Sequence, residues 1–325
     1  MGGSAMTKVL VTGGTGFIGS FLVKRLVDKG YAVRVFDNNF RGSLSKLGDY
    51  AGRVEILEGD ICDPKSVDKA TEGMDWVFHL AFINGTRHFY EIPHKVLEVG
   101  IHGALNTVES AIRHKIKRYI VASSAEVYQE PTHVPTTEKE RLIIPDITNP
   151  RYSYGGGKIV CELLALHMGP KHGLHTVVFR PHNVYGPDMG EEHVVPQFIR
   201  RMQNLSKSGK GKLRFPIQGS GQETRAFCYV DDVVNGVVLC GEKGLPSQIY
   251  HIGNDHEITI AEVAQKIALQ LGLKLDLQTG EMPTGSTPRR CPSIQKARTD
   301  LGYDPTVSLD EGLQRTCDWY CRHLA

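Results

Sequence analysis

The stretch TGGTGFIGS, residues 12–20, decides the fold of this chain. It follows the apolar, β-branched run KVLV and leads into FIGSFLVKRLVDKG, an amphipathic run that ends at Gly30. A strand, a glycine-rich turn and a helix in direct succession are typical of a dinucleotide-binding βαβ unit. Gly13 permits the tight turn, Gly16 lets a pyrophosphate approach the backbone, and Gly19 lets helix and strand pack closely.

The same alternation of apolar strand and amphipathic helix continues along the chain. Strands are expected within residues 32–38, 53–60, 74–82 and 118–124, with a helix near 93–114, and the pattern extends to HTVVFRPHNVYGP, residues 175–187. Buried strands separated by helices predict a parallel sheet with helices on both faces. Because such crossovers are right-handed, we expect an α/β fold with a doubly wound parallel sheet, the Rossmann arrangement.

The pattern loosens after HTVVFRPHNVYGP, which ends at residue 187. Segments 187–224 and 254–300 are rich in proline, glycine and polar residues, whereas 226–252 again resembles a helix leading back to the sheet. We therefore predict a dinucleotide-binding Rossmann domain over residues 1–180, to which 226–252 returns. Residues 181–325 are expected to form mainly a second, smaller α/β lobe that binds the substrate.

An acidic residue at the end of the second strand indicates which dinucleotide is bound. Asp37 lies 18 positions after Gly19, where a carboxylate accepts the ribose hydroxyls of adenosine and repels a 2′-phosphate. NAD is therefore favoured over NADP, although Arg41 weakens that preference. Asp60, in the stretch EGDICD, is expected to reach the adenine amino group, with a turn-forming aspartate as the alternative.

The composition excludes several classes of partner. The chain has 325 residues, 40% hydrophobic and 23% charged, with a formal net charge of +2, so we expect neither a nucleic acid nor a membrane as partner. No apolar run approaches the roughly 18 residues of a membrane span, and the first residues lack a signal-peptide pattern. Seven scattered cysteines without a CxxC pair indicate reduced thiols in the cytoplasm, and the 14 histidines show no metal-ligand spacing, so no metal is expected.

A tyrosine and a lysine one helical turn apart suggest the chemistry. Tyr154 and Lys158 share a helix face, and the lysine is expected to lower the pKa of the phenol toward neutrality. Ser124, just beyond an apolar strand, can hydrogen-bond the reacting oxygen. The three glycines at 155–157 each cost up to about 1 kcal/mol in a helix. Their missing side chains leave room either for a sugar or for a closer backbone approach.

These motifs, taken in order, carry a family resemblance. TGGTGFIGS, DNNFRG, GDICD, HLA, SSAEVY, YGGGK, RPHNVYGP, GSGQETRAFCYVDDVV and KARTDLGYDP resemble extended short-chain dehydrogenases/reductases of the nucleotide-sugar epimerase/dehydratase family. The resemblance implies a tightly held NAD that oxidises a hexose at carbon 4, with a nucleoside-diphosphate sugar as substrate. It also implies a homodimer formed through the helix of the YxxxK motif and the helix before it.

The resemblance assigns roles to individual residues. Ser124, Tyr154 and Lys158 fall on the catalytic triad, and Glu126 is a further candidate base. Ser124, Asn183, Arg225 and, more loosely, Arg289 fall on substrate contacts, the last three with the diphosphate. The expected NAD contacts are Gly13, Gly16, Phe17, Ile18, Asp37, Asn38, Asp60, Ile61, Leu80, Ala81, Tyr154, Lys158 and Pro181.

Departures from the family pattern leave the net reaction open. Ala125 has no proton to give to a leaving hydroxyl, whereas Glu126 could take a proton from carbon 5, as in 4,6-dehydratases or 3,5-epimerases. His193 is then a candidate for the missing general acid. Gly100 replaces an asparagine near the catalytic lysine, and Ala226 replaces an aspartate.

The leading prediction is an NAD-dependent nucleotide-sugar epimerase, an isomerase of carbohydrate metabolism or polysaccharide biosynthesis. The alternatives are a 4,6-dehydratase, a 3,5-type epimerase or a 4-dehydrogenase of the same family. A non-catalytic NAD-binding sensor or scaffold is the remote alternative. Such a protein can dispense with Tyr154 and Lys158, whereas this chain keeps both in register with Ser124.

Overall fold

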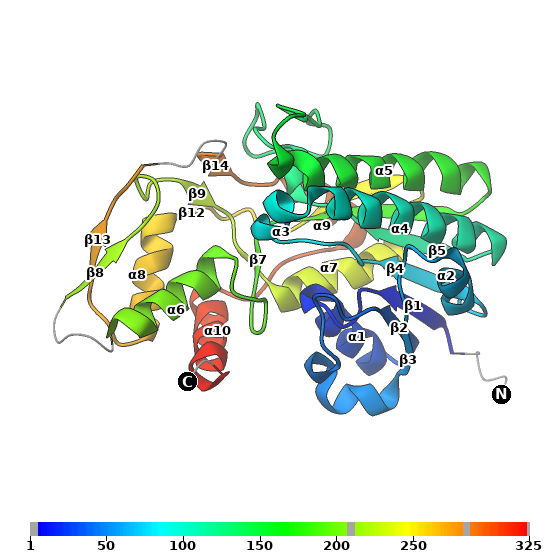
Figure 1. The fold of residues 1–325 in the computed structure, drawn as a ribbon, viewed down its shortest axis with the longest axis horizontal. Coiled ribbons are helices and arrows are strands. Elements are labelled where there is room, and N and C mark those ends of the chain that lie inside the picture. The colour runs from blue at the N-terminus through cyan, green and yellow to red at the C-terminus, as the bar shows by residue number, and fades with distance from the viewer. Residues whose placement is uncertain (1–5, 207–211, 282–286, 324–325) are drawn as a thin grey trace.

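The computed structural model describes residues 6–206, 212–281 and 287–323. Its central sheet consists of β1 (Lys8–Thr12), β2 (Ala32–Asp37), β3 (Glu55–Glu58), β4 (Trp76–His79), β5 (Arg118–Ala122), β6 (His175–Pro181) and β11 (Gln248–Ile252). These strands are parallel and lie in the order β11-β6-β5-β4-β1-β2-β3 (Figure 1). The chain thus winds outward in both directions from β1 and β4, which confirms the predicted doubly wound fold.

The strands form because their residues are apolar on both faces. Val9, Leu10 and Val11 of β1 are completely buried, as expected of a parallel sheet covered on both sides. In the register of the sheet, Val9 lies between Val33 of β2 and Trp76 of β4.

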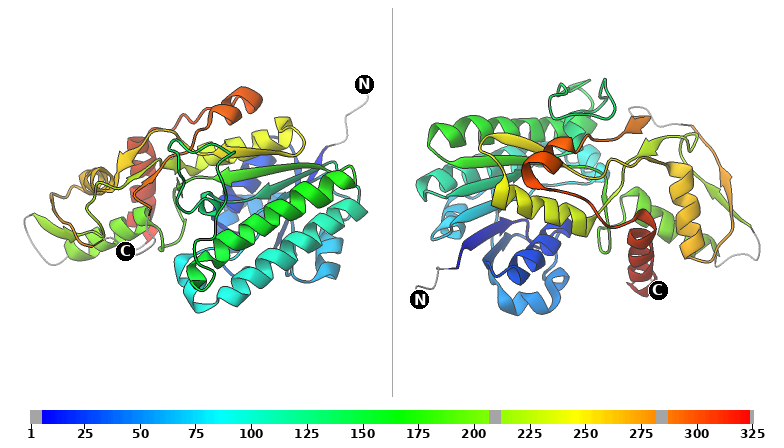
Figure 2. Two further views of the ribbon diagram at one scale, coloured as in Figure 1. Left: turned by 90° about the horizontal axis from the view of Figure 1, so that it is seen from above. Right: turned by 180° about the vertical axis from the view of Figure 1, so that it is seen from behind.

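Helices cover both faces of the sheet. One face carries α1 (Phe17–Asp28) and α7 (Val230–Lys243), and the other carries α2 (Pro64–Thr71), α4 (Pro93–Arg113) and α5 (Ser153–Lys171). Figure 1 shows α4 and α5 side by side above the sheet and α1 and α7 below it, and the view from behind in Figure 2 shows the same arrangement. Val108 and Ala111 are among the buried residues of α4, and Leu22 and Leu26 belong to the buried face of α1.

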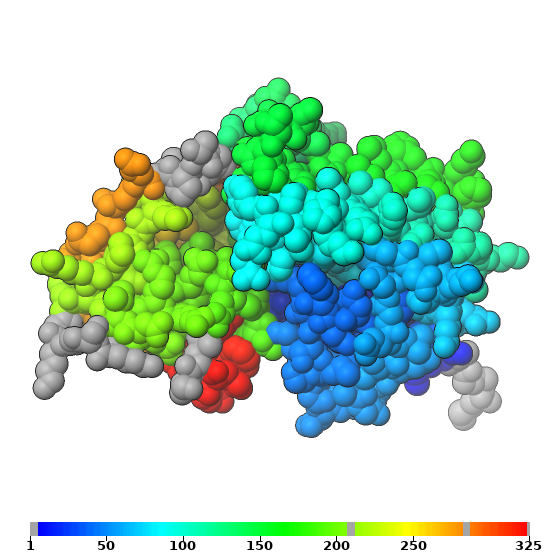
Figure 3. Space-filling model, in the orientation of Figure 1, coloured from blue at the N-terminus to red at the C-terminus, as the bar shows by residue number. Residues whose placement is uncertain are grey.

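A smaller lobe lies beside the carboxyl ends of the strands. Its elements are β7 (Val184–Tyr185), α6 (Val194–Ser206), β8 (Leu213–Pro216), β9 (Thr224–Arg225), β10 (Cys228–Tyr229), β12 (Ile258–Thr259), α8 (Ile260–Gln270), β13 (Leu275–Gln278), β14 (Arg289–Arg290) and α10 (Leu309–His323). Short sheets pair β8 with β13, β7 with β10, and β9 with both β12 and β14. The space-filling view shows this lobe and the sheet-bearing part in contact side by side (Figure 3).

The remaining elements are short connections. They are η1 (Leu44–Arg53), α3 (Thr86–Glu91), η2 (Ala125–Val127), η3 (Pro150–Tyr152) and α9 (Gln295–Leu301). We propose the boundary between the two lobes at the end of β6, with 226–252 returning to the sheet through α7 and β11. Within the described residues, no helix is both long and apolar enough to cross a membrane.

Candidate active site

A cavity of about 530 Å³ opens at the carboxyl ends of β1, β2, β4, β5 and β6. This edge of the sheet includes the point between β1 and β4 where the strand order reverses, which is where open α/β sheets bind ligands. The cavity is lined both by the glycine turn after β1 and by the catalytic candidates, so it joins the two ends of the site predicted from the sequence.

The glycine turn brings the backbone close to itself. Gly13 has φ +73°, and a Cβ there would lie 2.7 Å from the Ala81 nitrogen. A Cβ on Gly19 would overlap the Gly13 carbonyl oxygen, and one on Gly16 would lie 3.2 Å from the same atom. No larger residue fits at Gly13 or Gly19 unless the turn opens, so bare backbone at these two positions is a requirement of the fold.

Two aspartates flank the far end of the cavity. Asp37 accepts hydrogen bonds from the Thr15 amide at 3.0 Å and from the Asn39 amide at 2.9 Å, which fixes its carboxylate beside the glycine turn. Asp60 accepts from the Cys62 amide at 2.8 Å. Both aspartates line the cavity, as do the other predicted NAD contacts Gly13, Gly16, Phe17, Ile18, Asn38, Ile61, Leu80, Ala81 and Pro181.

Ser124, Tyr154 and Lys158 meet at the other end of the cavity. Lys158 donates a hydrogen bond to the Ala122 carbonyl at 2.7 Å, which ties α5 to the end of β5. The Tyr154 ring is stacked on Phe89 with a centroid distance of 4.9 Å. Ser124 hydrogen-bonds the Tyr154 side chain, so a substrate hydroxyl near one of them is near both.

The predicted effect of Lys158 on Tyr154 is wrong for the chain by itself. Burial raises the pKa of Tyr154 well above its usual value, and it outweighs the Ser124 hydrogen bond and the Arg41 charge, which lower it. The reason is geometric: the phenol is packed among aromatic rings, and the Lys158 ammonium donates to Ala122 rather than to the phenol. Burial also lowers the pKa of Lys158, to about 8.

Arg290, not the predicted Arg289, faces the cavity. Arg289 forms an exposed ion pair with Glu257, with an Nη2–Oε2 distance of 2.5 Å. Arg290 lines the cavity and forms an ion pair with Glu126, also a lining residue. Burial alone would raise the pKa of Glu126, but Arg290 and two further arginines hold it below its usual value. Glu126 is therefore ionised and paired.

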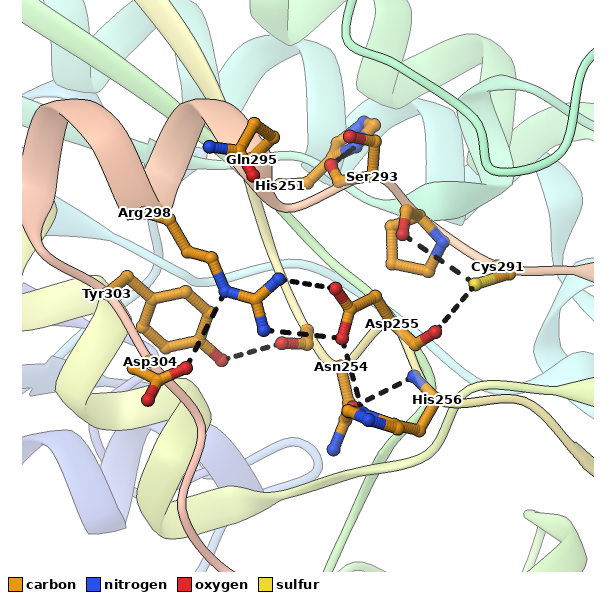
Figure 4. Close-up of polar contacts among 12 residues, drawn as sticks. His251, Asn254, Asp255, His256, Cys291, Ser293, Gln295, Arg298, Tyr303 and Asp304 are labelled. Carbon is orange, nitrogen blue, oxygen red and sulfur yellow. Dashed lines mark hydrogen bonds and ion pairs between the residues drawn. The ribbon is translucent and has the colours of Figure 1, made fainter.

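The segment that carries Arg290 is anchored by polar contacts (Figure 4). The next residue, Cys291, donates from Sγ to the Asp255 carbonyl at 3.5 Å, and Arg298 forms an ion pair with the Asp255 carboxylate at 2.5 Å. The Ser293 carbonyl is 3.0 Å from His251 Nδ1, so β11 of the main sheet also holds the segment. These contacts fix Arg290 although it lies far along the chain from Glu126.

The other predicted substrate contacts differ in their placement. Asn183 lines the cavity, and its side-chain amide donates to the Ala226 carbonyl at 3.2 Å. Arg225 is not among the residues that line the cavity, and its guanidinium donates to the Thr224 and Thr287 carbonyls, both at 2.7 Å. The charge of Arg225 still acts on Glu126. The roles of Asn183 and Arg225 in binding stay predictions.

A buried ion pair behind the site was not predicted. Arg180, at the end of β6, donates from Nε to Glu162 Oε1 at 2.8 Å, and the hydroxyl of Ser123 also donates to Glu162. The two charged side chains are only 2% and 4% exposed. One available signal was the position of Glu162, four residues after Lys158 and therefore on the same helix face.

A protein-family model covers most of the chain. The model of the NAD dependent epimerase/dehydratase family matches residues 9–253. The chain belongs to this family. Its members depend on NAD. The glycine turn and the two aspartates that line the cavity, Asp37 and Asp60, fit that dinucleotide.

Individual relatives have different reactions. UDP-glucuronic acid decarboxylase 1 of Danio rerio is 32% identical over 321 residues, which are 98% of this chain and 73% of that protein. UDP-glucose 4-epimerase of Thermotoga maritima, solved with UDP-glucose, is 30% identical, with a TM-score of 0.86 and coverage of 98% of this chain and 100% of that one. UDP-glucose 4-epimerase of Thermus thermophilus, solved with NAD, is 27% identical, with a TM-score of 0.83 and coverage of 97% and 99%. The chain therefore has relatives with different net reactions within one family, and its own net reaction does not follow from them.

The glycines of the catalytic turn face protein rather than the cavity. None of the three lines the cavity. A Cβ on Gly155 would lie 2.9 Å from the Glu126 carbonyl oxygen, whereas one on Gly156 would meet only the tip of the Ile144 side chain, at 3.2 Å. Close backbone approach therefore explains Gly155, and at Gly156 a side chain fits.

We predict opposite effects for two neighbouring substitutions in this turn. Gly155→Ala should lower the free energy of unfolding by about 1–3 kcal/mol, because the methyl group meets a fixed backbone carbonyl. Gly156→Ala should leave it unchanged or raise it by up to about 1 kcal/mol, because alanine is the better helix former. Urea denaturation of the two variants measures both effects, and equal losses of stability would contradict this account of the turn.

Tyr154 should respond to the charge of the bound cofactor. In cofactor-free protein we expect the phenol to stay protonated beyond its usual range, and the positive charge of oxidised NAD should lower its pKa by about 1–3 units. Ultraviolet difference spectra of the wild type minus Tyr154→Phe measure the tyrosinate at each pH. Reduced NADH, whose ring is uncharged, is the control. Equal pKa values with the two forms would show that the cofactor charge is not what activates Tyr154.

Proposed function

We propose that this protein is a nucleotide-sugar 4-epimerase, which inverts carbon 4 of a hexose through transient oxidation. The observation that carries the proposal is the meeting of Ser124, Tyr154 and Lys158 in one cavity with the glycine turn, while Glu126 is held by Arg290. Inversion at carbon 4 needs one proton acceptor and one hydride acceptor, and it requires no second base acting on the sugar ring.

The roles of the side chains follow from their positions. Tyr154, once ionised, takes the proton of the carbon-4 hydroxyl, and Ser124 hydrogen-bonds the same oxygen while it becomes a carbonyl. Lys158 holds a positive charge 5.9 Å from the centre of the Tyr154 ring and donates its hydrogen bond to the Ala122 carbonyl rather than to the phenol. NAD, when bound, supplies the acceptor that takes the hydride and later returns it. If the sugar presents its opposite face in between, Tyr154 returns the proton to the inverted hydroxyl.

The paired state of Glu126 argues against the alternatives that need it as a base. An ion pair that lowers the pKa of a carboxylate also weakens it as a proton acceptor, and the carbon-5 proton is weakly acidic. His193 lines the cavity, but burial and Arg41 lower its pKa, so it is mostly neutral and a poor general acid at neutral pH. A 4,6-dehydratase and a 3,5-type epimerase are therefore less well supported than the 4-epimerase.

One observation favours a second candidate, decarboxylation of a nucleoside-diphosphate hexuronic acid. Arg290 brings a guanidinium into the cavity, and guanidinium groups bind carboxylates well. Oxidation at carbon 4 would turn a carbon-6 carboxylate into a β-keto acid, which loses carbon dioxide readily. The Danio rerio relative is a UDP-glucuronic acid decarboxylase by name. Because the Arg290 guanidinium already forms an ion pair with Glu126, decarboxylation ranks second.

A panel of substrates separates these reactions. The protein is incubated with UDP-, GDP-, CDP- and dTDP-hexoses and with UDP-glucuronic acid, and the products are analysed by mass spectrometry and NMR. We expect a 4-epimer of unchanged mass from one of the hexoses, and no product from Tyr154→Phe. Loss of water, loss of carbon dioxide, or accumulation of a 4-keto sugar with NADH would each replace the epimerase by the corresponding alternative.

We further propose that the protein forms a homodimer through α4 and α5. The two helices lie side by side on the outside of the molecule (Figure 1), and Leu97 and Leu163 remain 37% and 51% exposed on them. Burial of these side chains against a second copy would remove apolar surface from water. Sedimentation equilibrium should give twice the mass of the chain, and Leu163→Glu should give a monomer; a monomeric wild type would contradict the proposal.

A further inference from the structure

Phe82 lies in a slot between α4 and α5 that two glycines create. A Cβ on Gly100 of α4 would lie 2.5 Å from the Phe82 Cε2 atom, and one on Gly157 of α5 would lie 3.1 Å from Cζ. The ring therefore occupies space that any larger residue at either position would take. It enters this slot from the end of β4 and lines the cavity.

The slot brings the face of the ring to Lys158. The Lys158 ammonium lies 4.0 Å from the Phe82 ring centroid, well within the range of a cation–π interaction. Among the described residues, its one hydrogen-bond partner is the Ala122 carbonyl, and no carboxylate forms an ion pair with it. Phe82 also meets the Tyr154 ring edge-on, with a centroid distance of 5.1 Å.

We propose that Phe82 is a positioning residue that holds the Lys158 ammonium on its ring face and keeps it protonated. The inference concerns the NAD site and does not depend on which reaction follows. Burial disfavours the charged form of an ammonium, whereas the negative face of an aromatic ring favours it. Gly100 explains why a ring fits here, because the asparagine that the family resemblance implies at this position would occupy the slot.

The Phe82 ring also leaves hydrogen-bond donors of Lys158 unused. An ammonium has three donors, of which one goes to the Ala122 carbonyl. A polar side chain in the slot would consume another donor, whereas a ring face attracts the charge and consumes none. The remaining donors are available for the hydroxyl groups of a bound dinucleotide.

The other titratable groups near Lys158 are Cys161, Glu162, His79 and Tyr154. Cys161 and Glu162 lie on its own helix; burial raises the pKa of the Cys161 thiol, and Glu162 forms an ion pair with Arg180. His79 of β4 has a pKa lowered to about 3 by burial and by Lys158 itself, so it stays neutral. Tyr154 has a raised pKa. With its pKa lowered to about 8, Lys158 changes charge just above neutral pH.

The test is the pH dependence of NAD affinity, measured by calorimetry on protein stripped of its cofactor. For the wild type we expect constant affinity at neutral pH and a decline as the pH rises through the pKa of Lys158. Phe82→Leu keeps the slot apolar but removes the ring face, so the midpoint of the decline should fall by about one pH unit. Phe89→Leu is the matched control, because the Phe89 ring stacks on Tyr154 rather than on the Lys158 ammonium; its midpoint should equal that of the wild type.

A second variant separates the charge effect from packing. Ring-fluorinated phenylalanine at position 82 keeps nearly the same volume but withdraws negative charge from the ring face, so the midpoint should again move down. A purely structural role of Phe82 would lower NAD affinity equally at every pH and leave the midpoint in place. Unchanged midpoints in both Phe82 variants would overturn the inference, whatever the substrate panel gives.

Discussion

The arrangement of the active site depends on one buried ion pair, between Arg180 at the end of β6 and Glu162 on α5. Two hydrogen bonds of 2.8 and 2.5 Å join the guanidinium to the carboxylate, and both side chains are almost completely buried. Removal of one partner from such a pair typically costs about 3–5 kcal/mol, so the helix is strongly held against sliding along the sheet. Lys158 lies one turn before Glu162 on α5. Ser123 donates to the same carboxylate, which fixes the strand end next to Ser124.

Because α5 and the end of β5 are held in this way, the backbone fixes where Tyr154 and Lys158 lie. Burial, in contrast, disfavours the charged form of each side chain. Burial raises the pKa of Tyr154, so the phenol stays protonated, and it lowers the pKa of Lys158 to about 8, so the ammonium is still largely charged at neutral pH. Ionisation of Tyr154 therefore requires a further positive charge that lowers its pKa. The family's dependence on NAD supplies a physical reason for that design, since an oxidised nicotinamide is cationic. Proton transfer is thereby linked to the presence of the hydride acceptor.

The sequence predicted the features that lie within one element or at one end of the sheet. The glycine turn, the doubly wound order and the YxxxK spacing are local patterns, and parallel strands bring their carboxyl ends to one edge. Contacts between distant elements could not be predicted in this way. Arg289 and Arg290 are neighbours on β14 that point to opposite sides, and only the strand pairing decides which one meets Glu126. The pKa of Tyr154 was predicted in the wrong direction because its aromatic neighbours come from other segments.

Oxidation of a sugar at carbon 4 can lead to different products, and the pairing of Glu126 with Arg290 affects which of them can form. Oxidation at carbon 4 makes the neighbouring carbon 5 more acidic, whatever follows. A free carboxylate there would promote proton abstraction, and a free guanidinium would attract a carboxylate on carbon 6. Here each group neutralises the other, so neither is offered to the ring. A substrate that breaks the ion pair must offer a new charged partner to Glu126 and to Arg290. An uncharged hydroxymethyl group at carbon 6 cannot do this. For a neutral hexose the ion pair has no such replacement partners, and this is the physical basis on which we propose return of the hydride to carbon 4.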